Sequence, residues 1–138
     1  MAKKDAIHDA VKNALIKDGW TITSEHFELK FEERRLYADL AAERPLVAER
    51  GDKKIVVEVK TFAGASLMNE LENAVGQYNV YLTFLEILEP ERRLFLAITD
   101  TIFYNFFQEK AVQLIINRFE VSLLIVDIKK EEVVQWIN

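Results

Sequence analysis

Apolar residues recur with helical spacing in two long segments of the chain, residues 4–18 and 66–88. Gly19 follows the first segment, where a left-handed residue commonly ends a helix. The second segment has Ser66 available as N-cap and Pro90 beyond its end. We therefore expect two amphipathic helices. Their buried stripes would hold Ile7, Ala10, Val11, Ala14 and Leu15 in the first, and Leu67, Leu71, Val75, Tyr78, Leu82 and Leu85 in the second.

Short apolar runs between and after these helices predict strands. Gly51-Asp52 marks a turn before one of these strands, and Asp100 or Thr101 is available to cap a further helix through about residue 118. The order of elements, roughly αβββαβαββ, predicts an α/β (α+β) fold in which helices flank a mixed β-sheet. The predicted strands are residues 20–22, 27–31, 35–42, 54–62, 93–99, 121–127 and 132–137.

Length and charge change this picture in two ways. The 138 residues, half of them apolar and without a repeat or a Pro/Gly/Ser linker, predict a single domain over 1–138. The net charge of −5 excludes a long-range field that would draw the whole molecule onto nucleic acid. Any contact with DNA would therefore use a partner or local basic pairs. The candidate pairs are Arg34-Arg35, Lys53-Lys54 and Arg92-Arg93, although solvated turns carry such pairs as well.

The absence of cysteine excludes disulfides, thiolate metal sites and cysteine nucleophiles. It also fits a reducing compartment. Residues 1–5 lead into an amphipathic pattern, and no apolar run approaches the roughly 20 residues of a membrane span. We expect a soluble, cytoplasmic protein without a membrane partner.

Glu58 and Lys60 are the most informative pair in the chain. Strand side chains alternate between faces, so this acid and this lysine project from the same side of the predicted strand 54–62. The pair could simply lie on the wet face of an antiparallel strand. However, Val56 and Phe62 share that face, which favours burial. A second acid, Asp39, lies within the predicted strand 35–42. Two strand carboxylates beside a lysine are typical of a site that holds a hard divalent ion and activates water against a phosphodiester.

The register between the two acidic strands is a difficulty for this hypothesis. If Gly51-Asp52 is the centre of a two-residue hairpin, Glu58 faces Pro45 and Asp39 lies about six residues farther along, roughly 20 Å away. Proline cannot donate a ladder hydrogen bond, so the pairing could break at Pro45. A shared metal requires that break, with residues 37–41 opposite 56–60.

The pattern resembles the PD-(D/E)xK nuclease superfamily. By position, Asp39 matches the first acid of that motif and Glu58-Val59-Lys60 matches the second half, while Ala38 departs from the proline that precedes the acid in the family. The resemblance implies a restriction-endonuclease-like fold. It also implies that Asp39 and Glu58 bind Mg²⁺ (or Mn²⁺) and that Lys60 orients the attacking water against DNA.

Polar residues on the predicted helices extend this hypothesis. Gln77 and Tyr81 are four residues apart and share a face, with Glu70 two turns before Gln77. The pair is similar to the glutamine-x-x-x-tyrosine motif of some nucleases in the superfamily, which implies an assisting role for Gln77. An ordinary polar helix edge is the alternative. His8 either faces the site or is a boundary residue of its helix.

Over its whole length the chain resembles the XisH family. The resemblance rests on Asp5-Ala6-Ile7-His8, Gly19-Trp20, Tyr37-Ala38-Asp39-Leu40 and residues 55–62. It implies a role in excision of the cyanobacterial fdxN element during heterocyst differentiation, with an XisI-like companion and a separate site-specific recombinase as partners. The nucleophile and arginine cluster of a serine recombinase are not found in the sequence, so the chain is not expected to be that recombinase.

Two function classes remain open at this point. In the first, the protein is a metal-dependent DNA endonuclease in which Asp39, Glu58, Lys60 and Gln77 form the site. In the second, it is a catalytically silent regulatory module that controls the recombinase through protein contacts. The net acidity and the apolar pair Phe106-Phe107 favour the second class, although these aromatics also fit a core. The sequence leaves a homo-oligomer open.

Overall fold

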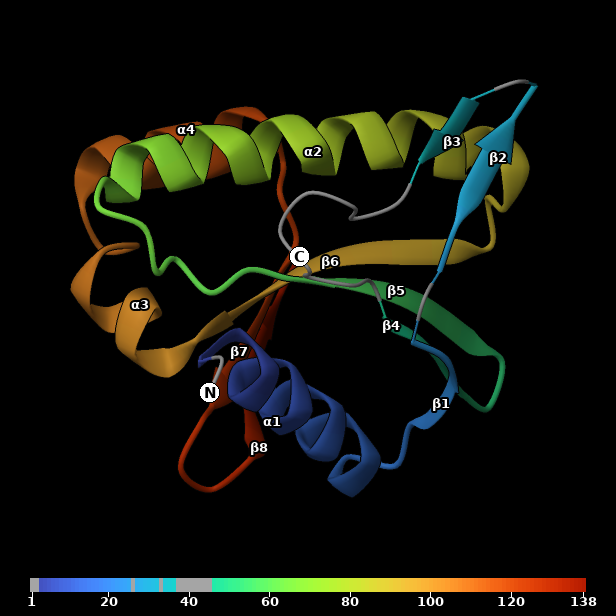
Figure 1. Ribbon diagram of the computed structural model, residues 1–138, viewed down its shortest axis with the longest axis horizontal. Coiled ribbons are helices and arrows are strands. Elements are labelled where there is room, and N and C mark those ends of the chain that lie inside the picture. Colours follow the sequence, from blue (N-terminus) through green and yellow to red (C-terminus); the bar gives the residue numbers. More distant parts are fainter. Residues whose placement is uncertain (1–2, 26, 33, 37–45) are drawn as a thin grey trace.

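The computed structural model describes residues 3–25, 27–32, 34–36 and 46–138. A six-stranded mixed sheet has one helix on one face and three helices on the other (Figure 1). The described elements are α1 (Lys3–Lys17), β1 (Thr21–Ser24), β2 (Leu29–Phe31), β3 (Arg34–Leu36), β4 (Leu46–Arg50), β5 (Lys53–Val59), α2 (Leu67–Leu88), β6 (Arg92–Thr99), α3 (Asp100–Asn105), α4 (Lys110–Arg118), β7 (Leu123–Asp127) and β8 (Glu132–Ile137). This arrangement confirms the predicted mixed sheet flanked by helices. No helix in the described ranges is long and apolar enough to cross a membrane.

Parallel pairing in the middle of the sheet determines at which edge a ligand-binding site is expected. The strand order is β1-β4-β5-β6-β7-β8, and β5, β6 and β7 run parallel while the outer pairs are antiparallel. Parallel neighbours need crossovers, and α2 connects β5 to β6 while α3 and α4 connect β6 to β7. The carboxyl ends of the three parallel strands therefore lie at one edge of the sheet, where ligands bind in open α/β sheets.

The first helix ends as the sequence predicts. Gly19 has a φ of +92°, in the left-handed region that favours glycine. The Gly19 N–H donates to the Ile16 carbonyl at 3.0 Å, and the Trp20 N–H donates to the Leu15 carbonyl at 3.0 Å. This pair of bonds is a Schellman motif, which satisfies carbonyls that the end of the helix would leave open.

The second helix is also confirmed, including its cap. The Ser66 side chain accepts a hydrogen bond from the Asn69 N–H at 3.2 Å, and Pro90 follows the last helical residue. Its apolar stripe packs on the sheet face that carries Val56, and α1 packs on the opposite face, against Val57. Each face of the sheet thus has its own apolar core. Phe106 and Phe107 are both buried, so they are core residues.

Several elements differ from those expected. The segment 46–50, for which no strand was predicted, forms β4 and is the antiparallel neighbour of β5. The described part of the predicted strand 35–42 belongs to β3, which pairs with β2 in a separate two-stranded sheet. The single helix expected up to residue 118 is two helices, with Thr99 as N-cap of the first. A continuous helix would point Phe106 and Phe107 about 100° apart, whereas both side chains are buried.

Candidate metal and phosphodiester site

Strand β5 presents Glu58 to the side of the sheet that α2 covers, and Lys60 directly follows the strand. Val56, two residues before Glu58, belongs to the core on that side, whereas Val57 and Val59 belong to the core against α1. Glu58 is 1% exposed and Lys60 is 8% exposed. The alternation and the burial predicted from the sequence are confirmed, and the alternative of a solvent-facing pair is wrong.

The surroundings of Glu58 make its charge energetically important. Both of its carboxylate oxygens are buried, and it lies beside Leu96 of β6 in the parallel register. Removing an ionised carboxylate from water costs several kcal/mol unless cations or hydrogen bonds offset the loss. An acid kept at such a position in a sheet core is a candidate functional group.

The backbone holds Lys60 at the end of the parallel ladder. The Lys60 N–H donates to the Ala97 carbonyl of β6 at 3.0 Å, one residue after β5 ends at Val59. The strand is three residues shorter than the predicted 54–62 at this end. Lys60 is therefore at the carboxyl edge of the sheet, where its side chain is mostly buried but close to the connection to α2.

The connection also contains Thr61, which the sequence analysis missed, and Phe62, for which it predicted only a place on the face of Glu58. Thr61 is buried, and its hydroxyl has no hydrogen-bond partner in the part of the chain that the structure describes. Phe62 has a φ of 53°, a left-handed conformation that costs a bulky residue about 1–3 kcal/mol. Its ring packs 5.5 Å from that of Phe107 and 6.2 Å from that of Phe106, measured between centroids. The sequence signal for Thr61 is its position directly after Glu58-Val59-Lys60.

The candidate site residues on helices lie on opposite faces of the sheet, three of them on α2 and one on α1. Tyr81 of α2 is buried in the same core as Val56, and Gln77, one turn earlier, is half-buried. Glu70 lies in the first turn of α2, and its carboxylate occupies the space that a side chain at Gly64 would need. His8 lies on α1, which packs against the opposite face of the sheet from Glu58.

Asp39 lies outside the described residues, but the register of its expected partner strand is clear. Leu46 pairs with Val57 and Arg50 pairs with Lys53, so Gly51-Asp52 forms a two-residue hairpin. The expected ladder of 37–41 against 56–60 is wrong, because β4 already occupies the edge of β5 at Val56 and Val57. On its other edge, β5 pairs with β6 from Lys54 to Val59.

A cation site at Glu58 would need further oxygen ligands. Within the described ranges, no group of three or more Asp, Glu or His side chains could hold a metal ion. The segment 37–45, which joins β3 to β4, contains two acids, Asp39 and Glu43. Both acids lie outside the described residues, and the pairing of β4 with β5 excludes the ladder that was expected to bring Asp39 opposite Glu58.

Comparison with known proteins supplies the family. A family model described as XisH protein matches residues 1–134. The crystal structure of an XisH family protein from Nostoc punctiforme PCC 73102 is similar to this chain. The two sequences are 37% identical, and the structures superpose with a TM-score of 0.90 over 97% of this chain and 100% of the other. A fdxN element excision controlling factor protein from Anabaena variabilis is 37% identical, with a TM-score of 0.89 over 97% and 99%. No curated protein matches. The chain belongs to the XisH family.

Proposed function

We propose that this protein is an excision controlling factor for programmed DNA rearrangement of the fdxN element type, and that it acts as a Mg²⁺-dependent DNA endonuclease at Glu58 and Lys60. The observation that carries the proposal is the burial of an acid and a lysine on one face at the carboxyl edge of parallel strands. The excision role is supported by the similarity to the excision controlling factor protein from Anabaena variabilis.

The residues present fit a hard cation in their chemistry. Glu58 offers two carboxylate oxygens, the ligand type that Mg²⁺ prefers, and the segment with Asp39 supplies further acids. When bound, Mg²⁺ or Mn²⁺ would polarise the phosphate and lower the pKa of a coordinated water. The Lys60 ammonium is a donor for a phosphate oxygen or the attacking water. Because Lys60 is mostly buried, its charge would stabilise the negative charge that the phosphoryl oxygens carry in the transition state. Gln77 would assist by hydrogen bonding.

Cleavage by the purified full-length chain tests the proposal. Supercoiled plasmid and labelled duplex DNA are incubated with Mg²⁺, with Mn²⁺ or with a chelator, and nicking is expected only with metal. Glu58→Gln and Lys60→Met keep the shape of each side chain and should lower the rate by at least about 100-fold. Exposed Glu132→Gln and Lys129→Gln are matched controls and should retain the wild-type rate. Undiminished cutting by both site variants would mean that the activity belongs to another site or protein.

A second pair of variants identifies the acid that completes the site. Asp39→Asn should abolish cutting if Asp39 is the metal ligand that the resemblance implies. Glu43→Gln should do so instead if the acid nearer to β4 is the ligand. Full activity in both variants would show that neither residue of this segment holds the metal.

A regulatory module without chemistry is the second candidate function, and the surface of α4 favours it. Leu114 is 65% exposed, and Phe119, directly after α4, is 47% exposed, so this side of the molecule offers apolar area for a protein partner. An XisI-like companion, a site-specific recombinase or a second copy of the chain would be that partner. Absence of cutting with every metal, together with binding of such a partner that Leu114→Glu abolishes, would select this function.

A further inference from the structure

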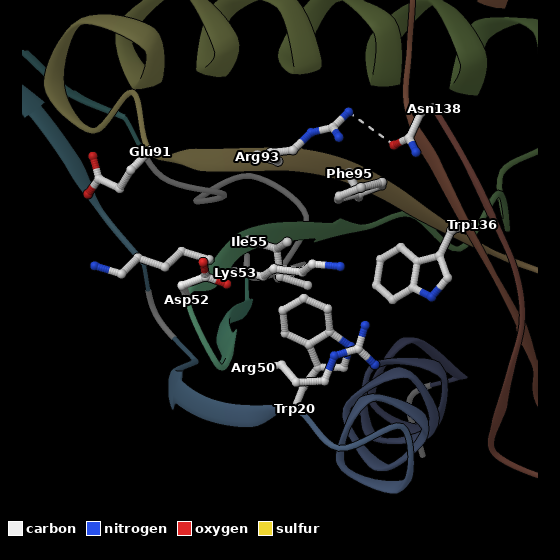
Figure 2. Close-up of a pocket in the computed structure, with 11 residues that line it drawn as sticks. Trp20, Arg50, Asp52, Lys53, Ile55, Glu91, Arg93, Phe95, Trp136 and Asn138 are labelled. Atoms are coloured by element: carbon white, nitrogen blue, oxygen red, sulfur yellow. Dashed lines mark hydrogen bonds between the residues drawn. The ribbon is translucent and has the colours of Figure 1, made fainter.

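A pocket of about 510 Å³ lies at the other end of β5 from Lys60. It is lined by Trp20, Ile55, Phe95 and Trp136, with Lys53 and Arg93 at its rim (Figure 2). Lys53 begins β5 and Lys60 follows its end, so about 23 Å separates them along the strand. Ile55 and Phe95 also belong to the core on the α1 face, whereas Glu58 faces α2. The pocket is therefore separate from the candidate metal site.

The wall of the pocket is a packed aromatic cluster. The Trp136 ring lies 5.7 Å from that of Trp20 and 4.9 Å from that of Phe95, measured between centroids. Trp20 is 5% exposed, whereas Trp136 is only half-buried. An accessible indole that its neighbours hold in place is a platform on which another flat ring can stack at little entropic cost.

Cations surround this cluster. The Arg50 guanidinium lies 4.5 Å from the centroid of Trp20, and Asp18 holds it there through an ion pair of 3.2 Å. The Arg93 guanidinium lies 5.5 Å from the centroid of Phe95 and donates to the Asn138 side-chain oxygen at 3.0 Å. Lys53 is exposed, and no hydrogen bond or ion pair of its ammonium is found among the described residues. Lys53 and Arg93 thus remain available to an anion.

The acidic side chains of the pocket lie away from Trp136. Figure 2 shows the Lys53 ammonium directed toward Trp136, while the carboxylates of Asp52 and Glu91 lie at the opposite end. The end near Trp136 therefore combines an aromatic face with positive charge. This combination is complementary to a ligand with a flat ring and a negative group a few ångströms away.

We propose that this pocket binds a nucleoside phosphate, with the base stacked on Trp136 and the phosphate between Lys53 and Arg93. Its volume is within the range of small-molecule sites, which is about 300–1,000 Å³. Single-stranded nucleic acid is recognised by the same combination of a stacking ring and nearby cations. The ligand is an unpaired nucleotide of a strand or a free nucleotide, because a base inside a duplex has no free face. The inference goes beyond the proposed nuclease site and does not depend on it.

Intrinsic fluorescence tests the proposal directly, because the chain contains two tryptophans and both line the pocket. Full-length protein is titrated with thymidine monophosphate, a short oligothymidylate and a blunt hairpin duplex, with excitation where thymine absorbs little. We expect saturable quenching by the oligothymidylate. Saturation by the monophosphate at similar phosphate concentration would identify a free nucleotide as the ligand, and saturation by the oligothymidylate alone would identify a strand.

A double variant tests the role of the two cations. Lys53→Gln with Arg93→Gln changes side chains at the rim of the pocket and should weaken binding by about fivefold or more. It should also reduce the magnitude of the salt slope of log K by about 0.7, which is the contribution of the one phosphate that the two cations neutralise on a single strand. Lys110→Gln with Lys129→Gln removes the same charge elsewhere on the exposed surface and should change neither quantity.

Three results would overturn the proposal. The first is that neither thymidine monophosphate nor the oligothymidylate quenches the fluorescence saturably. The second is that the control pair of variants weakens binding as much as the double variant does. The third is that the duplex binds as tightly as the oligothymidylate. Glu58→Gln and Lys60→Met should quench like the wild type, because they lie at the other end of β5. The failure of the nuclease proposal and the failure of this one are therefore distinguishable.

Discussion

The Tyr78 hydroxyl bridges β6 and the residue before β7, next to the point where the ladder between these two strands starts. It donates to the Leu94 carbonyl of β6 at 3.2 Å and accepts from the Ser122 N–H, just before β7, at 3.1 Å. The β6–β7 ladder starts at Leu96 and Leu123, two residues after Leu94 and one residue after Ser122. The hydroxyl of α2 thus replaces a ladder bond between the two strands. We expect Tyr78→Phe to destabilise the fold although it leaves the ring in place.

The magnitude follows from burial. Tyr78 is 2% exposed and Ser122 is 8% exposed, so water cannot easily replace the lost hydroxyl. A buried backbone N–H without a partner costs about 1–3 kcal/mol of unfolding free energy. For a chain of this size that loss corresponds to a melting temperature lower by roughly 3–12 °C.

Urea unfolding followed by circular dichroism measures this loss. The midpoint should fall at an unchanged m-value, since the surface exposed on unfolding is the same. Tyr104→Phe is the matched control, because Tyr104 is 59% exposed and its hydroxyl makes no hydrogen bond with the described residues. Equal midpoints for the two variants would refute the assignment of a stabilising role to the Tyr78 bridge.

Other variants test the caps, the turn and the helices by the same measurement. Gly76→Ala should stabilise α2 by about 0.8–1 kcal/mol, because its new Cβ meets no atom within 4 Å. In contrast, Gly19→Ala should destabilise by about 1–2 kcal/mol because of its φ of +92°, and equal effects at these two glycines would be inconsistent with the helix cap. Ser66→Ala should cost about 0.5–2 kcal/mol through loss of the bond to the Asn69 N–H. Phe62→Ala should cost about 3–5 kcal/mol, and a loss below about 1 kcal/mol would mean that its contacts with Phe106 and Phe107 do not stabilise the fold.

Local signals made much of this fold predictable. The caps at Gly19 and Ser66 bounded the first two helices, and the expected strand 132–137 coincides with β8. These features depend on residues near one another in sequence. The face alternation of β5 is equally local, which is why burial of Glu58 and Lys60 on a common side could be inferred.

The pairing of the strands and the sign of a backbone φ angle could not be predicted in the same way. A two-residue hairpin at Gly51-Asp52 implies that 46–50 is the neighbour of β5, whereas the metal-site hypothesis required 37–41 in that place, and the structure has the hairpin. Phe62 has a positive φ and packs against Phe106 and Phe107, more than 40 residues later in the sequence. An aromatic residue in the sequence does not indicate a positive φ, because aromatic residues rarely adopt one.

The alternation of short and long connections in the sheet has a consequence for folding order. β4 joins β5 through a two-residue turn, and β7 joins β8 through residues 128–131, so each outer pair can form from contacts close in sequence. β6 pairs in parallel with β5 and with β7. The first pair requires that the crossover through α2 is folded, and the second requires that the crossover through α3 and α4 is folded. We expect β6 to be the strand at which the two halves of the molecule are assembled last. A destabilised crossover helix should therefore slow refolding without preventing either hairpin from forming.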